Sequence, residues 1–359
     1  MSISTRPAPH RGPTTSAAGP DAALTMWTPS AGTRCGVAQY AAQLVAALHD
    51  VGRTVAHVPE PAPEPVGTRP GSGVLHLQHE HSLVAPERVA AAARRARESG
   101  VPLVVTEHTV LRATRRGPAD PDGDGPDPVT RDAWEDDVAA LVAHSAECAA
   151  LLRERRPGQR VALIPHGCPT WFPPRKARRG RVVATFGFLE PHKGLARLLD
   201  AAAALGDGDG GVEEVLLVGS TRAAWAEEWL ASLDLPLRVR RVPEFLDEDE
   251  IARRLAAEAD VLVFPYAQPR FAAVSGAVRV GLASGVPVLT SPTTWFSDLR
   301  DVTVQPATLQ TDDLAAGIAR LLDDTALRDE LVAAARQHCH DHSWARTARR
   351  HLDLYASLR

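Results

Sequence analysis

The segment G-F-L-E-P-H-K-G (187–194) holds residue types whose spacing suits phosphate chemistry. It follows an apolar run that we expect to be a strand, and it opens a predicted helix. Gly187 and Gly194 permit close approach of the backbone, and Lys193 would add a full positive charge to the partial charge of the helix N-terminus. The segment is therefore suited to a diphosphate. The alternative is that Lys193 only begins a solvated helix, and the spacing does not decide between the two.

A second candidate anion site lies in the segment 264–290. A predicted strand ends at Pro265, a loop with Arg270 follows, and Ser275 and Gly276 open a helix. The first N–H groups of that helix have no partner within it, and we expect them to point toward the segment 187–194. The commoner meaning of Ser-Gly is an ordinary N-cap before a packing helix, and this reading stays open.

Histidines and carboxylates gather where two predicted strands end, in H-L-Q-H-E-H (76–81) and T-E-H-T (106–109). Histidines at this spacing can converge on zinc. The chain has no H-E-x-x-H, however, and polar residues at the strand ends of α/β folds commonly line substrate clefts. We therefore expect a cleft without metal. The residues are His79, Glu80, His81 and His108.

Two other patterns are not interpreted as ligand sites, and one common cofactor motif is missing. The histidine-rich segment 338–342 is explained by the preference of helix C-termini for such residues. The segment D-P-D-G-D-G (120–125) copies the start of a calcium loop, but Arg131 occupies the position of the bidentate glutamate. No G-x-G-x-x-G follows the first strand, which argues against a nicotinamide dinucleotide.

These residues must be positioned by alternating strands and helices, the pattern of parallel βαβ units. We expect a Rossmann-like half at 24–172, in which the first strand, a glycine loop and a helix lead into further strands. A Pro/Gly/Asp-rich loop at 112–130 is predicted to be a lid or a disordered insertion. The expected strands are 24–27, 54–58, 74–79, 103–107, 139–144 and 161–164, with a helix at 86–99.

A second Rossmann-like half is expected at 182–342, after a basic, Pro-containing linker at 173–181. Asp247 and Glu250 predict a capping box. Residues 343–359 are expected to form a helix that crosses back to the first half, and residues 1–23 to be disordered. The predicted strands are 182–186, 214–218, 237–241, 261–264 and 286–290, and the predicted helices are 193–205, 221–233, 247–259, 275–283 and 314–340.

Composition limits the class of protein. The chain has 359 residues, with 44% hydrophobic and 23% charged residues, and a net charge of -4. This balance excludes a global basic field for nucleic acid. No run is long and apolar enough for a membrane helix, and the four scattered cysteines predict reduced thiols. We expect a cytoplasmic protein of two domains with a ligand cleft between them.

Nine short motifs follow one another along the chain: G-T-R-C-G-V-A-Q-Y, L-Q-H-E, V-V-T-E-H-T, L-V-A-H-S, I-P-H-G, G-F-L-E-P-H-K-G, L-L-V-G-S, S-G-V-P-V-L-T and S-W-A-R-T-A. In order and spacing, they resemble the motifs of the family 4 glycosyltransferases, retaining nucleotide-sugar enzymes of the GT-B fold. The resemblance runs from about residue 24 to 359. It implies that His108 lies near the donor sugar and that Lys193 binds the donor diphosphate.

The sequence departs from the family in two places. Phe188 occupies the position of a frequent arginine, and Ala272 and Val280 replace the E-x7-E pair that usually holds the ribose and sugar hydroxyls. We expect Ser275 and Gly276 to make diphosphate contacts, Arg270 to supplement the missing arginine, and Glu244 to be one candidate for the hydroxyls.

The resemblance predicts transfer of a glycosyl unit from a UDP- or GDP-sugar to a small-molecule, glycan or lipid-linked acceptor, without metal or cofactor. The alternatives are an inactive GT-B protein that binds a nucleotide or a partner subunit, and a nucleotide-sugar epimerase or hydrolase. The expected catalytic residues are His108 and Lys193. The expected donor site comprises Gly187, Lys193, Gly194, Gly219, Glu244, Arg270, Ser275 and Gly276, and the expected acceptor side comprises Arg34, Gly36, His79 and Glu80.

Overall fold

The structure is a computed structural model of the chain. It describes residues 24–60, 73–111, 137–175, 180–206, 210–221, 224–232, 237–244, 246–267 and 271–358. The expected disordered start, the loop at 112–130, part of the linker and Arg270 lie outside the described residues. Among the described residues, no helix has both the length and the apolar character needed to cross a bilayer.

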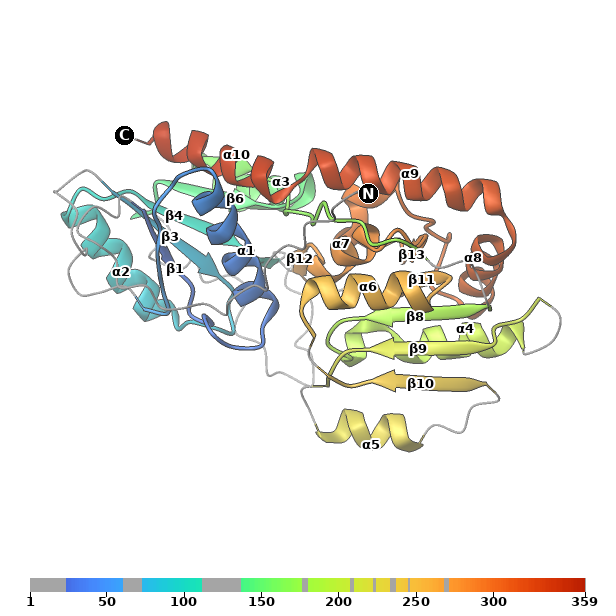
Figure 1. The fold of residues 1–359 in the computed structure, drawn as a ribbon. Helices are drawn as coiled ribbons and strands as arrows, with labels where there is room; N and C mark the ends of the chain where they lie inside the picture. Colours follow the sequence, from blue (N-terminus) through green and yellow to red (C-terminus); the bar gives the residue numbers. More distant parts are fainter. Residues whose placement is uncertain are drawn as a thin grey trace, which may run out of the picture.

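The first half of the chain forms a parallel six-stranded sheet in the order β2-β1-β3-β4-β6-β7, as the βαβ pattern predicts (Figure 1). Most residues of its central strands are buried, and the apolar stripes of its helices pack on the two faces. The elements are β1 (Leu24–Trp27), α1 (Gly36–Asp50), β2 (Ala56–Val58), β3 (Val74–His79), α2 (Pro86–Glu98), β4 (Leu103–Glu107), β6 (Ala140–Ala143), α3 (Ala146–Arg155) and β7 (Val161–Leu163).

The second half forms a parallel five-stranded sheet in the order β10-β9-β8-β11-β13, again with helices on both faces. The elements are β8 (Val182–Phe186), α4 (Leu195–Leu205), β9 (Glu214–Val218), α5 (Ala224–Ser232), β10 (Arg238–Val242), α6 (Glu248–Glu258), β11 (Val261–Phe264), α7 (Gly276–Ala283), β13 (Val288–Thr290), α8 (Thr311–Asp323), α9 (Thr325–Asp341) and α10 (Trp344–Ala356).

Two predicted helices differ from the structure. The single helix expected at 314–340 is two, because Asp324 ends α8 and its side chain accepts the N–H of Leu327 at 2.9 Å to begin α9. The helix expected from Lys193 begins instead at Leu195, after a 3₁₀ turn (Pro191–Lys193) and a left-handed Gly194. The N-cap at Asp247 is confirmed, since its carboxylate accepts the N–H of Glu250 at 2.7 Å.

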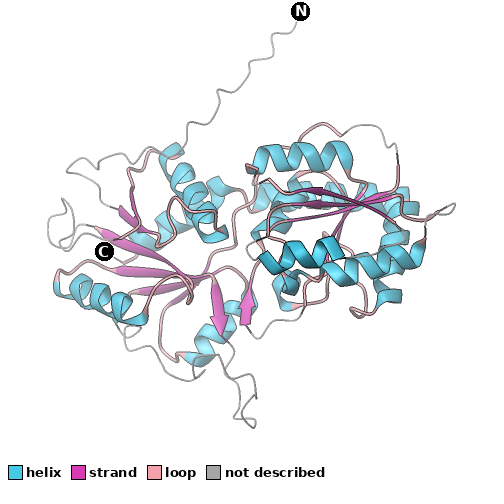
Figure 2. Cartoon of the chain, turned by 90° about the horizontal axis from the view of Figure 1, so that it is seen from below, coloured by secondary structure: helices cyan, strands magenta, loops and turns pink. Residues whose placement is uncertain are grey.

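A small third sheet joins the two halves, and the sequence patterns did not predict it. Strand β5 (Thr109–Leu111), from the first half, pairs antiparallel with β12 (Phe271–Ala273), from the second. Figure 2 shows this pair between the two larger sheets. Ala272 is buried within the hydrophobic core of the first half. Each strand has only three residues, too few for a periodic pattern to be recognised.

Helix α10 makes a further connection, because it packs on α1 of the first half. The hydroxyl of Tyr40 on α1 lies 3.3 Å from Nε2 of His351 on α10. The hydroxyl of Tyr355 lies 2.6 Å from Nδ1 of His76 on β3. These buried polar contacts align the end of the chain with the first sheet.

Candidate functional site

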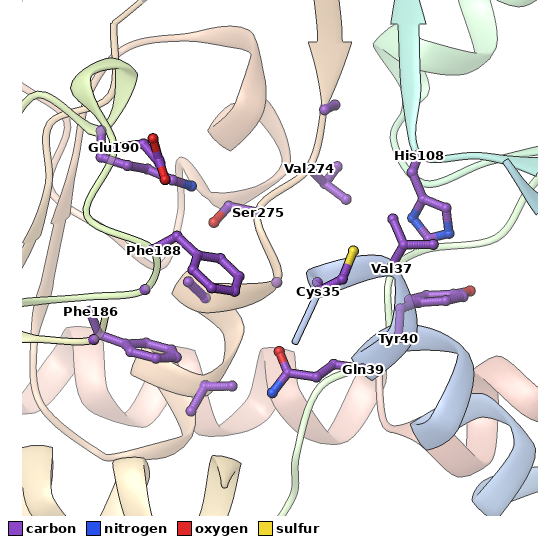
Figure 3. Close-up of a pocket in the computed structure, with 18 of the residues that line it drawn as sticks. Cys35, Val37, Gln39, Tyr40, His108, Phe186, Phe188, Glu190, Val274 and Ser275 are labelled. Carbon is purple, nitrogen blue, oxygen red and sulfur yellow. The ribbon is translucent and has the colours of Figure 1, made fainter. Parts of the chain in front are cut away.

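A cavity of about 490 Å³ lies between the two halves, at the carboxyl ends of strands from both large sheets. Figure 3 shows Phe186, Phe188, Glu190 and Ser275 on one wall, facing Cys35, Gln39, Tyr40 and His108 on the other. The predicted site residues that line it are Gly36, Glu80, His108, Gly187, Lys193, Gly219, Glu244, Ser275 and Gly276.

Two glycines hold the ends of β8 and β9 together beside the cavity. Gly187 and Gly219 have φ angles of 127° and 129°, which side chains disfavour. A Cβ on Gly219 would lie 2.0 Å from the carbonyl oxygen of Gly187, so only glycine fits there. At these two positions the backbone can therefore approach a ligand without a side chain of its own in between.

Gly194 has a different role from the one predicted. It is buried, and a Cβ on it would lie 2.0 Å from the carbonyl oxygen of Pro265. Its φ of 71° places it in the left-handed region that begins α4. It therefore fixes a turn and is not part of the cavity wall.

Lys193 lines the cavity, but aromatic rings rather than a helix start hold it in place. Its Nζ lies 3.9 Å from the ring centroid of Tyr266 and 5.3 Å from that of Trp295. A cation on the faces of two rings is restrained in position while it keeps its charge. Sequence reasoning missed both aromatic residues, which are distant from Lys193 along the chain.

Ser275 and Gly276 begin α7 at the cavity, as predicted. The Ser275 side chain makes no capping hydrogen bond to α7, and its Oγ lies 3.3 Å from the hydroxyl of Tyr266. The first N–H groups of α7 are thus not satisfied by their N-cap side chain. They add a partial positive charge to the wall that holds Lys193.

A buried arginine supports this helix start and was not predicted. Arg279 is 1% exposed, and its guanidinium donates to the carbonyl of Ser275 at 2.9 Å and pairs with Asp298. Its charge therefore lies one turn below the beginning of α7. In the sequence it is one arginine among many, and only the fold distinguishes it.

His108 follows β4 and lines the opposite wall. Its Nε2 lies 3.0 Å from Oε1 of Gln78, and its ring packs edge-on against Tyr40 with centroids 4.9 Å apart. Burial, followed by the neighbouring His144 and His79, lowers the pKa of His108 well below its usual value. The ring is therefore neutral at physiological pH.

Other rings extend this wall. His166, from the I-P-H-G motif, and Trp344, from α10, both line the cavity and pack together with centroids 5.4 Å apart. Nδ1 of His166 lies 2.7 Å from the carbonyl oxygen of Gly167. The motif was recognised in the sequence, but its histidine was not singled out as a site residue.

The predicted acceptor side is only partly brought together. Gly36 and Glu80 line the cavity, and Glu80 accepts the N–H of Ser82 at 3.0 Å. Arg34 is exposed, and it does not line the cavity. His79 is also absent from the wall, because it is buried.

His79 belongs to a cluster behind the cavity. Its Nδ1 lies 2.8 Å from the Glu107 carboxylate, and Glu107 has a lowered pKa because His79, His81 and Arg155 favour its charged form against the opposing effect of burial. His79, His81 and Glu107 are residue types that bind metals, with ligand atoms within 4.8 Å of one another. The short contact between His79 and Glu107 is a hydrogen-bonded pair, which accounts for both residues without an ion.

Two carboxylates lie at the end of the cavity formed by β10 and α6. Glu244 is exposed, whereas Glu248 is half-buried and accepts a hydrogen bond from Gln43 of α1 at 3.2 Å. Burial, with Asp249 and Asp247 nearby, raises the pKa of Glu248 to about 7. Sequence reasoning missed Glu248, since only tertiary contact buries it.

The two positions that depart from the E-x7-E pattern have separate environments. Val280 lines the cavity and is buried in the core of the second half. Ala272 does not line the cavity, because its side chain packs into the core of the first half.

The chain is similar to proteins of known family. Residues 192–353 match the family described as glycosyl transferase-like. A D-inositol 3-phosphate glycosyltransferase of Nocardiopsis dassonvillei is 31% identical over 310 residues, which cover 78% of this chain and 70% of the relative. The chain belongs to the glycosyl transferase family. A relative of the same name from Salinispora tropica is 29% identical over 291 residues, which cover 71% of this chain but 59% of that protein.

Solved structures place this glycosyl transferase family member in the GT-B fold, which confirms the expected fold class. Anabaena Alr3699/HepE in complex with UDP has a TM-score of 0.68 at 14% identity and covers 93% of this chain and 100% of that chain. AviGT4, a glycosyltransferase involved in avilamycin A biosynthesis, has a TM-score of 0.59 at 16% identity and covers 93% and 97% of the two chains.

Proposed function

We propose that this chain transfers a glycosyl unit from a UDP- or GDP-sugar to a hydroxyl-bearing acceptor, with retention at the anomeric carbon and without a metal. The observation that carries the proposal is one cavity wall on which Lys193, the start of α7 and the glycine loops of β8 and β9 meet. Such a wall suits a diphosphate, since it combines a fixed cation with unpaired N–H groups.

The same wall supports the chemistry of the leaving group. When the bond between the anomeric carbon and the diphosphate breaks, negative charge grows on the departing phosphate oxygen. Lys193 and the N–H groups of α7 are held in place before the reaction, so they stabilise this charge without rearranging. The acceptor oxygen forms the new bond to the anomeric carbon and gives its proton to the departing phosphate oxygen, so the products are the glycoside and the nucleoside diphosphate.

The opposite wall is proposed to hold the sugar and the acceptor. His108 is neutral and can exchange a hydrogen bond with a sugar hydroxyl, while Glu80 can accept one from the acceptor. Retention and the roles of these residues rest on the family resemblance. The neighbour crystallised with UDP supports UDP as the first nucleotide to test.

A thermal-shift screen of UDP-, GDP-, TDP- and ADP-sugars tests the donor class. We expect one nucleotide to stabilise the protein, because a ligand that binds only the folded state raises the melting temperature. Release of the nucleoside diphosphate with each acceptor class then measures transfer. Absence of stabilisation by every nucleotide sugar would contradict the proposal.

A second candidate is a nucleotide-binding protein without transferase activity. It is favoured by Val280, whose apolar side chain lines the cavity where the family resemblance places a glutamate. Stabilisation by a nucleotide sugar with no product in any assay would support it. Product analysis also separates the epimerase and hydrolase alternatives, because the former changes the sugar while the latter releases it to water.

A further inference from the structure

The proposed sugar-binding residue His108 is connected to a buried glutamine. Gln78, on β3, is fully buried, and its Oε1 lies 3.0 Å from Nε2 of His108. Its amide nitrogen lies 3.0 Å from Sδ of Met26 and 3.3 Å from Nε2 of His76. Among the residues that the structure describes, Gln78 is the hydrogen-bonding neighbour of the His108 ring.

The contact with Met26 determines which way the amide points. A thioether sulfur has no proton to donate, so it can only accept a hydrogen bond. The NH₂ group of Gln78 must therefore face Met26, and its carbonyl oxygen must face His108. In the flipped orientation, two acceptors would face each other at 3.0 Å in a buried position.

The neighbouring network is consistent with this orientation. Nε2 of His76 accepts from Gln78 and also lies 2.7 Å from the hydroxyl of Thr106. Nδ1 of His76 then carries its proton and donates to the hydroxyl of Tyr355 at 2.6 Å. Burial lowers the pKa of His76 to about 3, so this ring is neutral with a single proton.

We propose that Gln78 is a positioning residue that fixes the tautomer of His108, with the proton on Nε2 and the lone pair on Nδ1. Because the carbonyl oxygen of Gln78 can only accept, Nε2 of His108 must donate to it. The ring is neutral, so its remaining polar atom, Nδ1, is an acceptor. His108 lines the cavity, so a ligand that meets this ring through Nδ1 meets an acceptor, to which a sugar hydroxyl would donate its proton. This inference rests on the proposed function.

The tautomer can be measured without any substrate. Histidine labelled with ¹⁵N gives ring nitrogen shifts that distinguish a protonated from an unprotonated nitrogen, and the H108N variant identifies the His108 signals. We expect the Nε2-protonated form in the wild-type protein. The Nδ1-protonated form would overturn the inference, even if the protein proves to be a glycosyltransferase.

A variant then tests the role of Gln78. In Q78L the acceptor is lost, because leucine has a similar size but no polar atom, so we expect the His108 signals to shift toward the Nδ1-protonated form. Turnover of UDP-glucose should fall about tenfold, the loss expected for one hydrogen bond, while the affinity for UDP stays unchanged. An unchanged tautomer in Q78L, or a loss of UDP affinity equal to the loss of turnover, would contradict the inference.

T106V is the matched control, because Thr106 belongs to the same buried network but contacts His76 rather than His108. It should leave the tautomer of His108 and the turnover unchanged, and an equal loss of turnover in T106V would show that the network is only structural. If the wild-type protein turns over no nucleotide sugar, the proposed function fails. The NMR measurement on the wild-type protein still decides the tautomer in that case, and also if Q78L does not fold.

Discussion

At the residue scale, Lys193 shows how a flexible cation becomes a fixed charge. An exposed lysine samples many rotamers, whereas the rings of Tyr266 and Trp295 confine its ammonium beside the cavity. If the diphosphate lies here, this confinement reduces the reorganisation needed when the leaving group gains charge.

We predict that K193A lowers turnover by about 10²-fold or more and weakens binding of the nucleoside diphosphate, because it removes one preorganised charge. Steady-state kinetics and titration calorimetry with the nucleotide found in the screen measure both effects. R197A is the matched control, since Arg197 lies on the following helix and outside the cavity wall. Unchanged affinity and rate in K193A would remove Lys193 from the site.

Val280 is the second position to test at this scale. V280E places a carboxylate among the apolar side chains of a core cluster that includes Ile251. We expect weaker nucleotide binding and a lower melting temperature, because an unpaired buried charge is costly. V280A controls for the loss of packing alone. Equal nucleotide affinity in V280E and the wild type would show that position 280 does not face the nucleotide.

The reaction should also proceed in EDTA. The proposed site meets the diphosphate with Lys193 and backbone N–H groups, which perform the charge neutralisation that a divalent cation performs elsewhere. The rate of sugar transfer is compared in EDTA and in MgCl₂ or MnCl₂, and the two should agree. A rate that vanishes in EDTA and returns with either cation would contradict this prediction.

At the scale of elements, the β5–β12 pair links the segment after His108 with the segment before Ser275. Ala273 pairs with Thr109, so a pair of hydrogen-bonded strands joins the two walls of the cavity. This pair lies next to His108 on one wall and close to Ser275 on the other. The pair therefore sets the distance between the walls.

We predict that A272E destabilises the protein by more than about 3 kcal/mol, because the side chain at 272 is 1% exposed within the core of the first half. Chemical denaturation measures the change. A204E, at an exposed position of α4, should leave the stability nearly unchanged. A stable A272E variant would show that β12 does not pack as described.

At the scale of the whole molecule, the halves also meet through Gln43 and Glu248. The raised pKa of Glu248 makes this contact sensitive to pH. The folded state holds a proton on Glu248 up to about pH 7, whereas the unfolded state loses it near the ordinary value of 4.5. The contribution of Glu248 to stability is thus fully present below about pH 4.5 and is lost as the pH rises toward about 7.

We therefore predict that E248Q is more stable than the wild type at pH 8 and that this advantage shrinks as the pH falls toward 5. The pKa shift from 4.5 to about 7 sets an upper limit of about 3 kcal/mol, which partial exposure of the carboxyl reduces. Melting temperatures across this pH range measure the effect. E244Q, at the exposed neighbour, should show no such dependence, and parallel curves for E248Q and the wild type would contradict the prediction.

The sequence by itself determined the two parallel sheets, most of their helices and much of one cavity wall. Alternating apolar runs and helical stripes predict both parallel sheets, because strand and helix periodicity are local properties. Gly187 and Lys193 could be singled out because they share one short segment, in which glycines and a cation follow an apolar strand. For the same reason the Asp247 cap was predictable, whereas the break at Asp324 was overlooked within a long helical pattern.

Only the tertiary structure decided which distant residues act together. Gln78 with His108, Lys193 with Tyr266 and Trp295, Glu248 with Gln43, and β5 with β12 are contacts between segments that no local pattern connects. The fold also removed Arg34, His79 and Gly194 from the predicted cavity wall. The physical reason is that charge, tautomer and exposure depend on burial and on partners, and both are set when the two halves pack against each other.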